Sequence, residues 1–167
     1  MTDRSSDRDL LLFHPDLSAL PPVPALPDGY RLPVSVWQSR GEPQAIVMAL
    51  HGFNDYRNAF EATGRALAVH GIVTYAYDQR GFGKTPVRGR WSSTEVMGRD
   101  LKTLIHLIKQ KYPDPPLYLL GHSMGALHCT TFTSMRPQRL PGRPNRLCPL
   151  QCALSAGRMS RLPREIF

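Results

Sequence analysis

Short apolar runs divide the chain into candidate strands separated by candidate helices. Residues 45–50 and 72–77 are almost entirely apolar, which is typical of strands buried on both faces of a parallel sheet. Residues 30–37 instead alternate apolar and polar side chains, as a half-buried antiparallel strand does, and Pro33 suits an edge or a bulge. With the apolar run 117–120, these segments predict one antiparallel lead strand and three parallel strands.

Between these runs, apolar residues recur at the spacing of helices. The expected helices are 57–70, 92–111 and 124–135. Ser92 can cap the second helix, because Glu95 follows three residues later at the spacing of a capping box. The alternation of strand and helix predicts an α/β fold, with a mostly parallel sheet and flanking helices.

Composition limits this α/β domain to residues 30–135. Residues 1–29 are polar and then proline-rich, which predicts an extended lead-in; a Pro-rich docking ligand is the alternative. Residues 136–167 hold seven arginines, five prolines and one acid, and carry +6 of the net charge of +8. We expect this Arg- and Pro-rich tail to be irregular, and its abrupt change of composition suggests a truncated or frameshifted end. A tail that binds RNA or a membrane is the rival interpretation, but its arginines are not interleaved with aromatic residues.

Nothing in the composition indicates a cofactor or a metal. Cys129, Cys148 and Cys152 have no metal-binding spacing and are odd in number, which fits reduced thiols. No apolar run approaches the roughly 20 residues of a membrane span, and the first residues do not form a signal peptide. We expect a cytoplasmic protein with no cofactor, no metal and no nucleic-acid partner, and leave contact with a membrane surface open.

The sequence around Ser123 is the strongest candidate for chemistry. A Gly-x-Ser-x-Gly sequence at 121–125 follows the apolar run 117–120 and precedes a predicted helix. A serine hydroxyl is a weak nucleophile, and a sharp strand-to-helix turn holds it where a base can reach it. The glycines let strand and helix approach closely, and the helix N-terminus favours a developing negative charge.

Two further loops should lie at the same edge of the sheet, because both follow the carboxyl end of a predicted strand. They are His51-Gly52-Phe53 and Asp78-Gln79-Arg80-Gly81-Phe82-Gly83-Lys84. Together with the Gly-x-Ser-x-Gly sequence, these loops resemble the monoacylglycerol lipase or lysophospholipase-like branch of the α/β-hydrolases, also called serine aminopeptidase S33. The resemblance covers about residues 30–135. It implies the N-terminal half of that fold and hydrolysis of lipid-like carboxylic esters such as monoacylglycerols or lysophospholipids.

The same resemblance assigns roles to three residues. Ser123 would be the nucleophile, and the backbone N–H groups of Phe53 and Met124 would hold the oxyanion of the tetrahedral intermediate. Losing one such donor costs roughly 10²–10³ in rate. Phe53 could also serve as an apolar cover for the strand end, since catalysis would use only its backbone. No substrate-binding residue is indicated.

The acid and the histidine of a Ser–Asp–His triad follow the serine in this fold, and this sequence lacks both. Residues 124–167 contain no Asp, and their only acid and only histidine are Glu165 and His128. His128 follows Ser123 by five residues on a helix that leads away from the site, so we do not expect it to act as the base. His51 belongs to the oxyanion loop by resemblance.

The other polar residues near the site are interpreted as structural. His122 should point away from the nucleophile and pack or orient the turn. Asp78 and Arg80 should bond backbone groups in a loop whose turn is allowed by Gly81 and Gly83.

Two function classes therefore stand. In the first, the chain is a serine ester hydrolase that is weak or inactive because its triad is incomplete. In the second, it is a non-catalytic fragment or a binding module with a basic tail. In either case no strand is expected after the helix that starts at Ser123. Strand 117–120 should then form an exposed apolar edge that promotes self-association.

Overall fold

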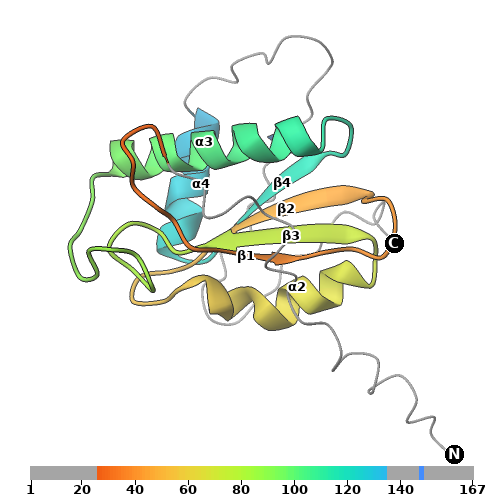
Figure 1. The fold of residues 1–167 in the computed structure, drawn as a ribbon, viewed down its shortest axis with the longest axis horizontal. Helices are drawn as coiled ribbons and strands as arrows, with labels where there is room; N and C mark the ends of the chain where they lie inside the picture. The colour runs from red at the N-terminus through yellow and green to blue at the C-terminus, as the bar shows by residue number, and fades with distance from the viewer. Residues whose placement is uncertain (1–25, 135–146, 149–167) are drawn as a thin grey trace, which may run out of the picture.

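The computed structural model describes residues 26–134 and 147–148 as a sheet between two layers of helices (Figure 1). In chain order the elements are β1 (Val34–Trp37), β2 (Ala45–Leu50), the 3₁₀ helix η2 (Arg57–Phe60), α2 (Glu61–Ala68), β3 (Ile72–Tyr77), α3 (Thr94–Lys111), β4 (Leu117–Gly121), α4 (Met124–Ser134) and β5 (Leu147–Cys148). Figure 1 shows α3 and α4 on one side of the sheet and α2 on the other.

The sheet is mostly parallel, as the apolar runs predict. Its strand order is β1-β3-β2-β4-β5. Strand β2 pairs in parallel with β3 and with β4, while β1 pairs antiparallel to β3. The predicted α/β class and the antiparallel lead strand are therefore confirmed. Because β2, β3 and β4 run in the same direction, the loops that follow them meet at one edge of the sheet.

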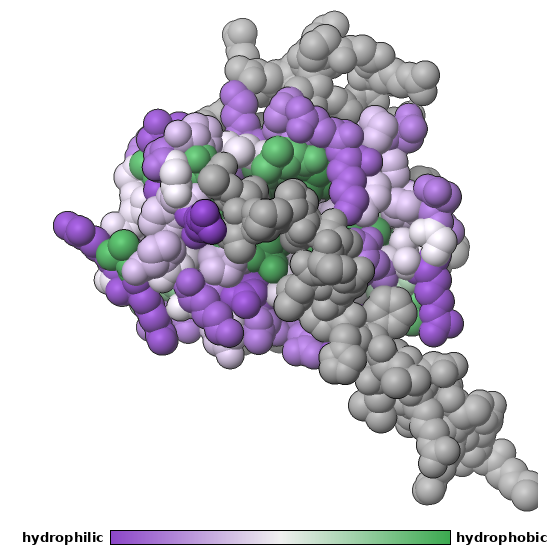
Figure 2. Space-filling view, viewed as in Figure 1, coloured by the Kyte–Doolittle hydropathy of each residue, from purple (hydrophilic) through white to green (hydrophobic). Residues whose placement is uncertain are grey.

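The main core lies between the sheet and the α3–α4 layer. Alternate residues of β2 point into it, namely Ile46, Met48 and Leu50, and meet buried leucines and isoleucines of α3. A smaller cluster around Trp37 and Phe60 fills the α2 side. Figure 2 shows the described surface on the viewed side as largely hydrophilic with small apolar patches, which fits a core held between the layers.

The N-cap of α3 differs from the prediction by one residue, and the helix starts two residues later than predicted. Ser93, not Ser92, is the N-cap, because its backbone is extended and its side chain accepts a hydrogen bond from the Val96 N–H at 3.3 Å. The helix therefore begins at Thr94. The predicted helix 57–70 is also divided, since its first turn is the 3₁₀ helix η2 and only α2 is α-helical.

The lead strand is shorter than predicted, and a residue that precedes it packs in the core. Only Val34–Trp37 form β1, yet Leu26 is buried in the main core and its N–H donates to the Tyr30 carbonyl at 3.0 Å. The predictions for residues 1–25 and for most of the tail lie outside the described residues. Among the helices that are described, none is long and apolar enough to cross a membrane.

The absence of a strand after α4 was a wrong prediction. Leu147 and Cys148 form β5, which pairs in parallel with Leu117 and Tyr118 of β4. A strand of two residues is too short to produce a recognisable sequence pattern. Within the described ranges, the remainder of β4 from Leu119 onward pairs on its β2 side only.

Because the edge of β4 is only partly paired, we still predict that the protein self-associates. Unpaired N–H and C=O groups on an apolar edge strand provide a template for pairing with a second chain. We expect light scattering to detect oligomers of the purified protein at micromolar concentration. A monomer that melts cooperatively at the same concentration would contradict this expectation.

Candidate active site

Ser123 lies on a strained turn between β4 and α4. Its backbone has a φ of +51°, in the left-handed region that non-glycine residues seldom adopt, and its side chain is exposed. The turn is closed by a hydrogen bond from the Gly125 N–H to the His122 carbonyl at 2.9 Å. Strain of this kind persists only where the surrounding structure enforces it, and it is concentrated at functional sites. Ser123 is thus exposed beyond the end of β4, on the turn that the sequence predicts.

The glycines of the turn are needed for close approach. A Cβ on Gly121 would fall within 3.0 Å of the Ala126 backbone, and one on Gly125 would overlap the carbonyl groups of Leu50 and His51. The start of α4 therefore rests directly on the end of β4 and on the end of β2. This contact brings the serine turn against the loop that begins at His51.

The loop after β2 touches the serine turn through Gly52. A Cβ at this residue would lie 2.8 Å from the His122 Nδ1 atom and 3.4 Å from the His122 carbonyl oxygen, so the two loops are in close contact here. The next residue, Phe53, and the residue after the serine, Met124, have backbone N–H groups with no acceptor in the described part of the chain. Unpaired donors on two loops in contact are the arrangement that an oxyanion site requires.

A buried hydrogen-bond network supports the loop after β2. The Gln79 side chain donates from Nε2 to the His51 carbonyl at 2.8 Å, and the Gln79 N–H donates to His51 Nε2 at 3.0 Å. His51 Nδ1 is therefore protonated and donates to the Gly52 carbonyl at 2.7 Å. Both ring nitrogens of His51 are occupied, so this histidine has no free lone pair with which to accept the serine proton.

His128 belongs to the same network. Because Gln79 uses its amide nitrogen for the His51 carbonyl, its Oε1 atom faces His128 and accepts from Nδ1 at 2.7 Å. His128 is 4% exposed and lies on α4 beneath the turn. Among the described residues, the structure records no hydrogen bond between the Ser123 hydroxyl and either of these histidines.

The two buried histidines predict loss of stability in acid. Burial lowers the pKa of His51 and of His128 below the usual value near 6.5. Below about pH 6.5 the unfolded chain thus binds more protons than the folded protein, and the free energy of unfolding falls as the pH falls toward the lower folded pKa values.

Urea unfolding at pH 7.5 and pH 5.5 tests this prediction. We expect a lower midpoint at pH 5.5, and the exposed variant His70→Gln should show the same difference between the two pH values. The buried variant His128→Leu should reduce the difference. Equal urea midpoints for the wild-type protein at both pH values would contradict the lowered pKa values of the two buried histidines.

Asp78 joins the loops after β2 and β3. Its buried carboxylate accepts from the Arg57 N–H at 2.9 Å and from the Lys84 N–H at 2.8 Å, and it pairs with the Arg57 guanidinium. Gly83 has a φ of +56°, and a Cβ there would overlap the carboxylate. Asp78 therefore bonds backbone N–H groups, as the sequence predicts.

Arg80 differs from its prediction, since it pairs with carboxylates. It donates to Asp100 on α3 at 2.6 and 2.9 Å and to Asp28 at 2.7 Å, and its guanidinium lies 4.2 Å from the Tyr30 ring centroid. The pairing connects residues about 20 positions apart or more, so local spacing gives no signal of it. Asp100 itself offered a hint, as an acid on the buried face of a predicted helix.

Gln79 and Arg57 are the supporting residues that the sequence analysis missed. Gln79 lies two residues past the predicted strand 72–77, and Arg57 begins the predicted helix 57–70; a polar side chain in a loop or at a helix start was the only available signal. Within the described residues, no group of three or more His, Cys, Asp or Glu side chains could hold a metal ion.

Comparisons with known proteins agree with this geometry. A family model described as serine aminopeptidase, S33, matches residues 41–143, which is more than half of the chain. The monoglyceride lipase of Rattus norvegicus is 28% identical over 116 residues, covering 69% of this chain and 38% of that protein. The monoacylglycerol lipase of Mycolicibacterium smegmatis is 28% identical over 98 residues, covering 58% of this chain and 35% of that protein.

Solved structures give the same result. A soluble variant of monoglyceride lipase from Saccharomyces cerevisiae, in complex with a substrate analogue, superposes with a TM-score of 0.58 at 25% identity. The match covers 70% of this chain and 40% of that one, so the chain spans less than half the length of the relatives it matches. The fold corresponds to the N-terminal part of an α/β-hydrolase. The chain therefore belongs to the serine aminopeptidase S33 family, in the monoacylglycerol lipase-like branch of the α/β-hydrolases.

Proposed function

We propose that the site is that of a serine ester hydrolase for lipid-like carboxylic esters, with Ser123 as the nucleophile. The observation that carries the proposal is the exposed Ser123 at φ +51°, on a turn in contact with the loop that bears the unpaired Phe53 N–H. The relatives named monoglyceride lipase support a small lipid ester as the substrate class.

In this mechanism Ser123 Oγ attacks the ester carbonyl. The carbonyl oxygen becomes an oxyanion and accepts hydrogen bonds from the N–H groups of Phe53 and Met124. The acyl group is transferred to Oγ as the alcohol leaves, and water then releases the acid. The serine proton must pass to a base, and the sequence after Ser123 offers only His128, which is buried and makes no hydrogen bond to the Ser123 hydroxyl in the described structure. We therefore propose that this chain holds the nucleophile and the oxyanion donors without the base, and is weak or inactive as it stands.

A non-catalytic fragment or binding module is the second candidate. It is favoured by the burial of both histidines, because neither makes a hydrogen bond to the Ser123 hydroxyl in the described part of the structure. In that case the turn and its glycines would serve folding alone.

Supplying a base from solution separates the two candidates. Hydrolysis of p-nitrophenyl butyrate is measured with and without added imidazole, using Ser123→Ala as the blank for hydrolysis by imidazole itself. We expect imidazole to produce a rate in the wild-type protein that the Ser123→Ala variant lacks, since a general base contributes roughly 10²–10⁴. Equal rates for the two proteins at every imidazole concentration would favour the non-catalytic candidate.

A further inference from the structure

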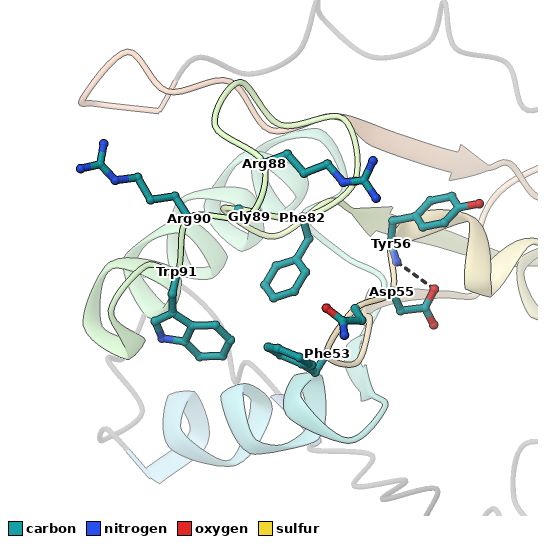
Figure 3. A pocket seen from close by; sticks show the side chains of 11 residues that line it. Phe53, Asp55, Tyr56, Phe82, Arg88, Gly89, Arg90 and Trp91 are labelled. Atoms are coloured by element: carbon teal, nitrogen blue, oxygen red, sulfur yellow. Dashed lines mark hydrogen bonds between the residues drawn. The ribbon is translucent and has the colours of Figure 1, made fainter.

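A pocket of about 280 Å³ lies beside the Ser123 site, between the loop after β2 and the loop after β3 (Figure 3). It is lined by residues 53–56, 81–83 and 88–91. Phe53 belongs to both places, because its N–H is the proposed oxyanion donor and its ring forms a wall of this pocket. Ser123 does not line it, and the proposed hydrolysis assigns the pocket no role.

Three aromatic rings gather on one side of the pocket. Phe53, Phe82 and Trp91 contact one another in pairs, with ring centroids 5.7 to 6.0 Å apart. Phe53 is 58% exposed and Trp91 is 57% exposed, although both are large apolar side chains. A cluster of exposed aromatic rings at the rim of a pocket marks a binding site more often than a surface without function.

The walls of the pocket are fixed by the fold. Asp78 accepts hydrogen bonds from the N–H groups of Arg57 and Lys84, which directly follow the lining residues Tyr56 and Gly83. The second loop is closed on itself, because the Gly89 N–H donates to the Gly81 carbonyl at 2.7 Å. Gly81 has a φ of +85°, and a Cβ there would overlap the Arg90 carbonyl. The rings therefore stand on a preformed frame, which lowers the ordering cost of binding.

The charges around the pocket favour an anion. Its lining includes Arg88, Arg90 and a single acid, Asp55. Figure 3 shows Arg88 extending toward the side where Asp55 and Tyr56 lie, whereas Arg90 points away from the three rings. A cationic ligand, which aromatic side chains also attract, would be repelled by Arg88. Arg88 is the side chain placed to pair with an anionic group whose aromatic part rests on the rings.

We propose that this pocket binds a small molecule composed of one aromatic ring and a carboxylate. A ring contacts Phe53 and Trp91 at their edges and faces, and the carboxylate pairs with Arg88. The volume lies just below the roughly 300–1,000 Å³ of pockets for drug-sized ligands, so a single ring with a short chain suits it. Binding needs neither Ser123 nor a catalytic base, so it is independent of the proposed hydrolysis.

Trp91 provides the measurement, because it lines the pocket while the other tryptophan, Trp37, is 2% exposed. Intrinsic fluorescence is titrated with 3-phenylpropionate, with 3-cyclohexylpropionate and with 3-phenylpropyl-trimethylammonium. We expect saturable quenching by 3-phenylpropionate at about millimolar concentration, as befits a ligand of this size. The cyclohexyl acid should bind about 3-fold to 10-fold more weakly, because it lacks the aromatic ring.

Variants that keep Trp91 complete the test. Phe53→Leu and Arg88→Gln should each weaken the binding of 3-phenylpropionate by about 3-fold to 10-fold. Val69→Ala, which removes an exposed apolar side chain outside the pocket, should not change the affinity, and neither should Ser123→Ala. Circular dichroism checks that each variant is folded. The proposal is overturned if quenching does not saturate, if the cyclohexyl acid binds equally well, or if the ammonium compound binds most tightly.

Discussion

This chain is expected to hydrolyse p-nitrophenyl butyrate within about 10⁴-fold of the uncatalysed rate in the absence of added base. In a triad whose members act as a unit, loss of the base alone costs roughly 10⁶ in turnover. What is left is the contribution of the oxyanion donors and of substrate binding. Ser123→Ala should then change the rate little, because no base activates the Ser123 hydroxyl in the proposed wild-type site.

The buried histidines are the controls for this prediction. His51 has both ring nitrogens engaged, and His128 is buried and makes no hydrogen bond to the Ser123 hydroxyl in the described structure. His51→Ala and His128→Ala should therefore leave the low rate unchanged, provided that circular dichroism shows folded protein. Turnover of about 1 s⁻¹ or more in the wild-type protein, abolished by Ser123→Ala, would mean that a base acts on the serine after all.

Replacing Asp78 with alanine should destabilise the protein more than any surface substitution. The variant removes a fully buried carboxylate and leaves Arg57 without its ion-pair partner and the Lys84 N–H without its acceptor. Breaking a buried pair from one side costs about 3–5 kcal/mol. For a chain of this size, the melting temperature should fall by roughly 2–4 °C for each kcal/mol of stability that is lost. Calorimetry can measure this change.

Glu61→Ala is the matched control for Asp78→Ala. It also removes one carboxylate from an arginine pair, but Glu61 and Arg65 form an i,i+4 pair on the surface of α2. Such pairs contribute about 0.3–0.5 kcal/mol. If both variants melt at the same temperature, Asp78 does not hold the two loops together as described.

The sheet and the serine turn were predictable because each leaves a local pattern. Nearly continuous apolar runs identify β2 and β3, since strands buried on both faces carry few polar side chains. The turn is predictable because its geometry admits only glycine at Gly121 and Gly125. Both signals are contained within a few consecutive residues.

What the sequence did not reveal depends on contacts between distant segments. The pairing of Arg80 with Asp100 and the hydrogen bonds of Gln79 to His51 and His128 form only when the loops are brought together. Ser92 and Ser93 are equally good caps by composition, and the backbone decides between them. The two-residue strand β5 carries no periodicity at all.

Labelling of Ser123 by a fluorophosphonate tests the central claim most directly. The probe reacts with a serine that a base has activated, and intact-protein and peptide mass spectrometry locate the adduct. The account predicts that Ser123 is labelled no faster than the other serines of the chain at pH 7.5, because the serine turn and the proposed oxyanion donors are present without a base. Rapid stoichiometric labelling at Ser123 alone, absent from Ser123→Ala, would contradict it.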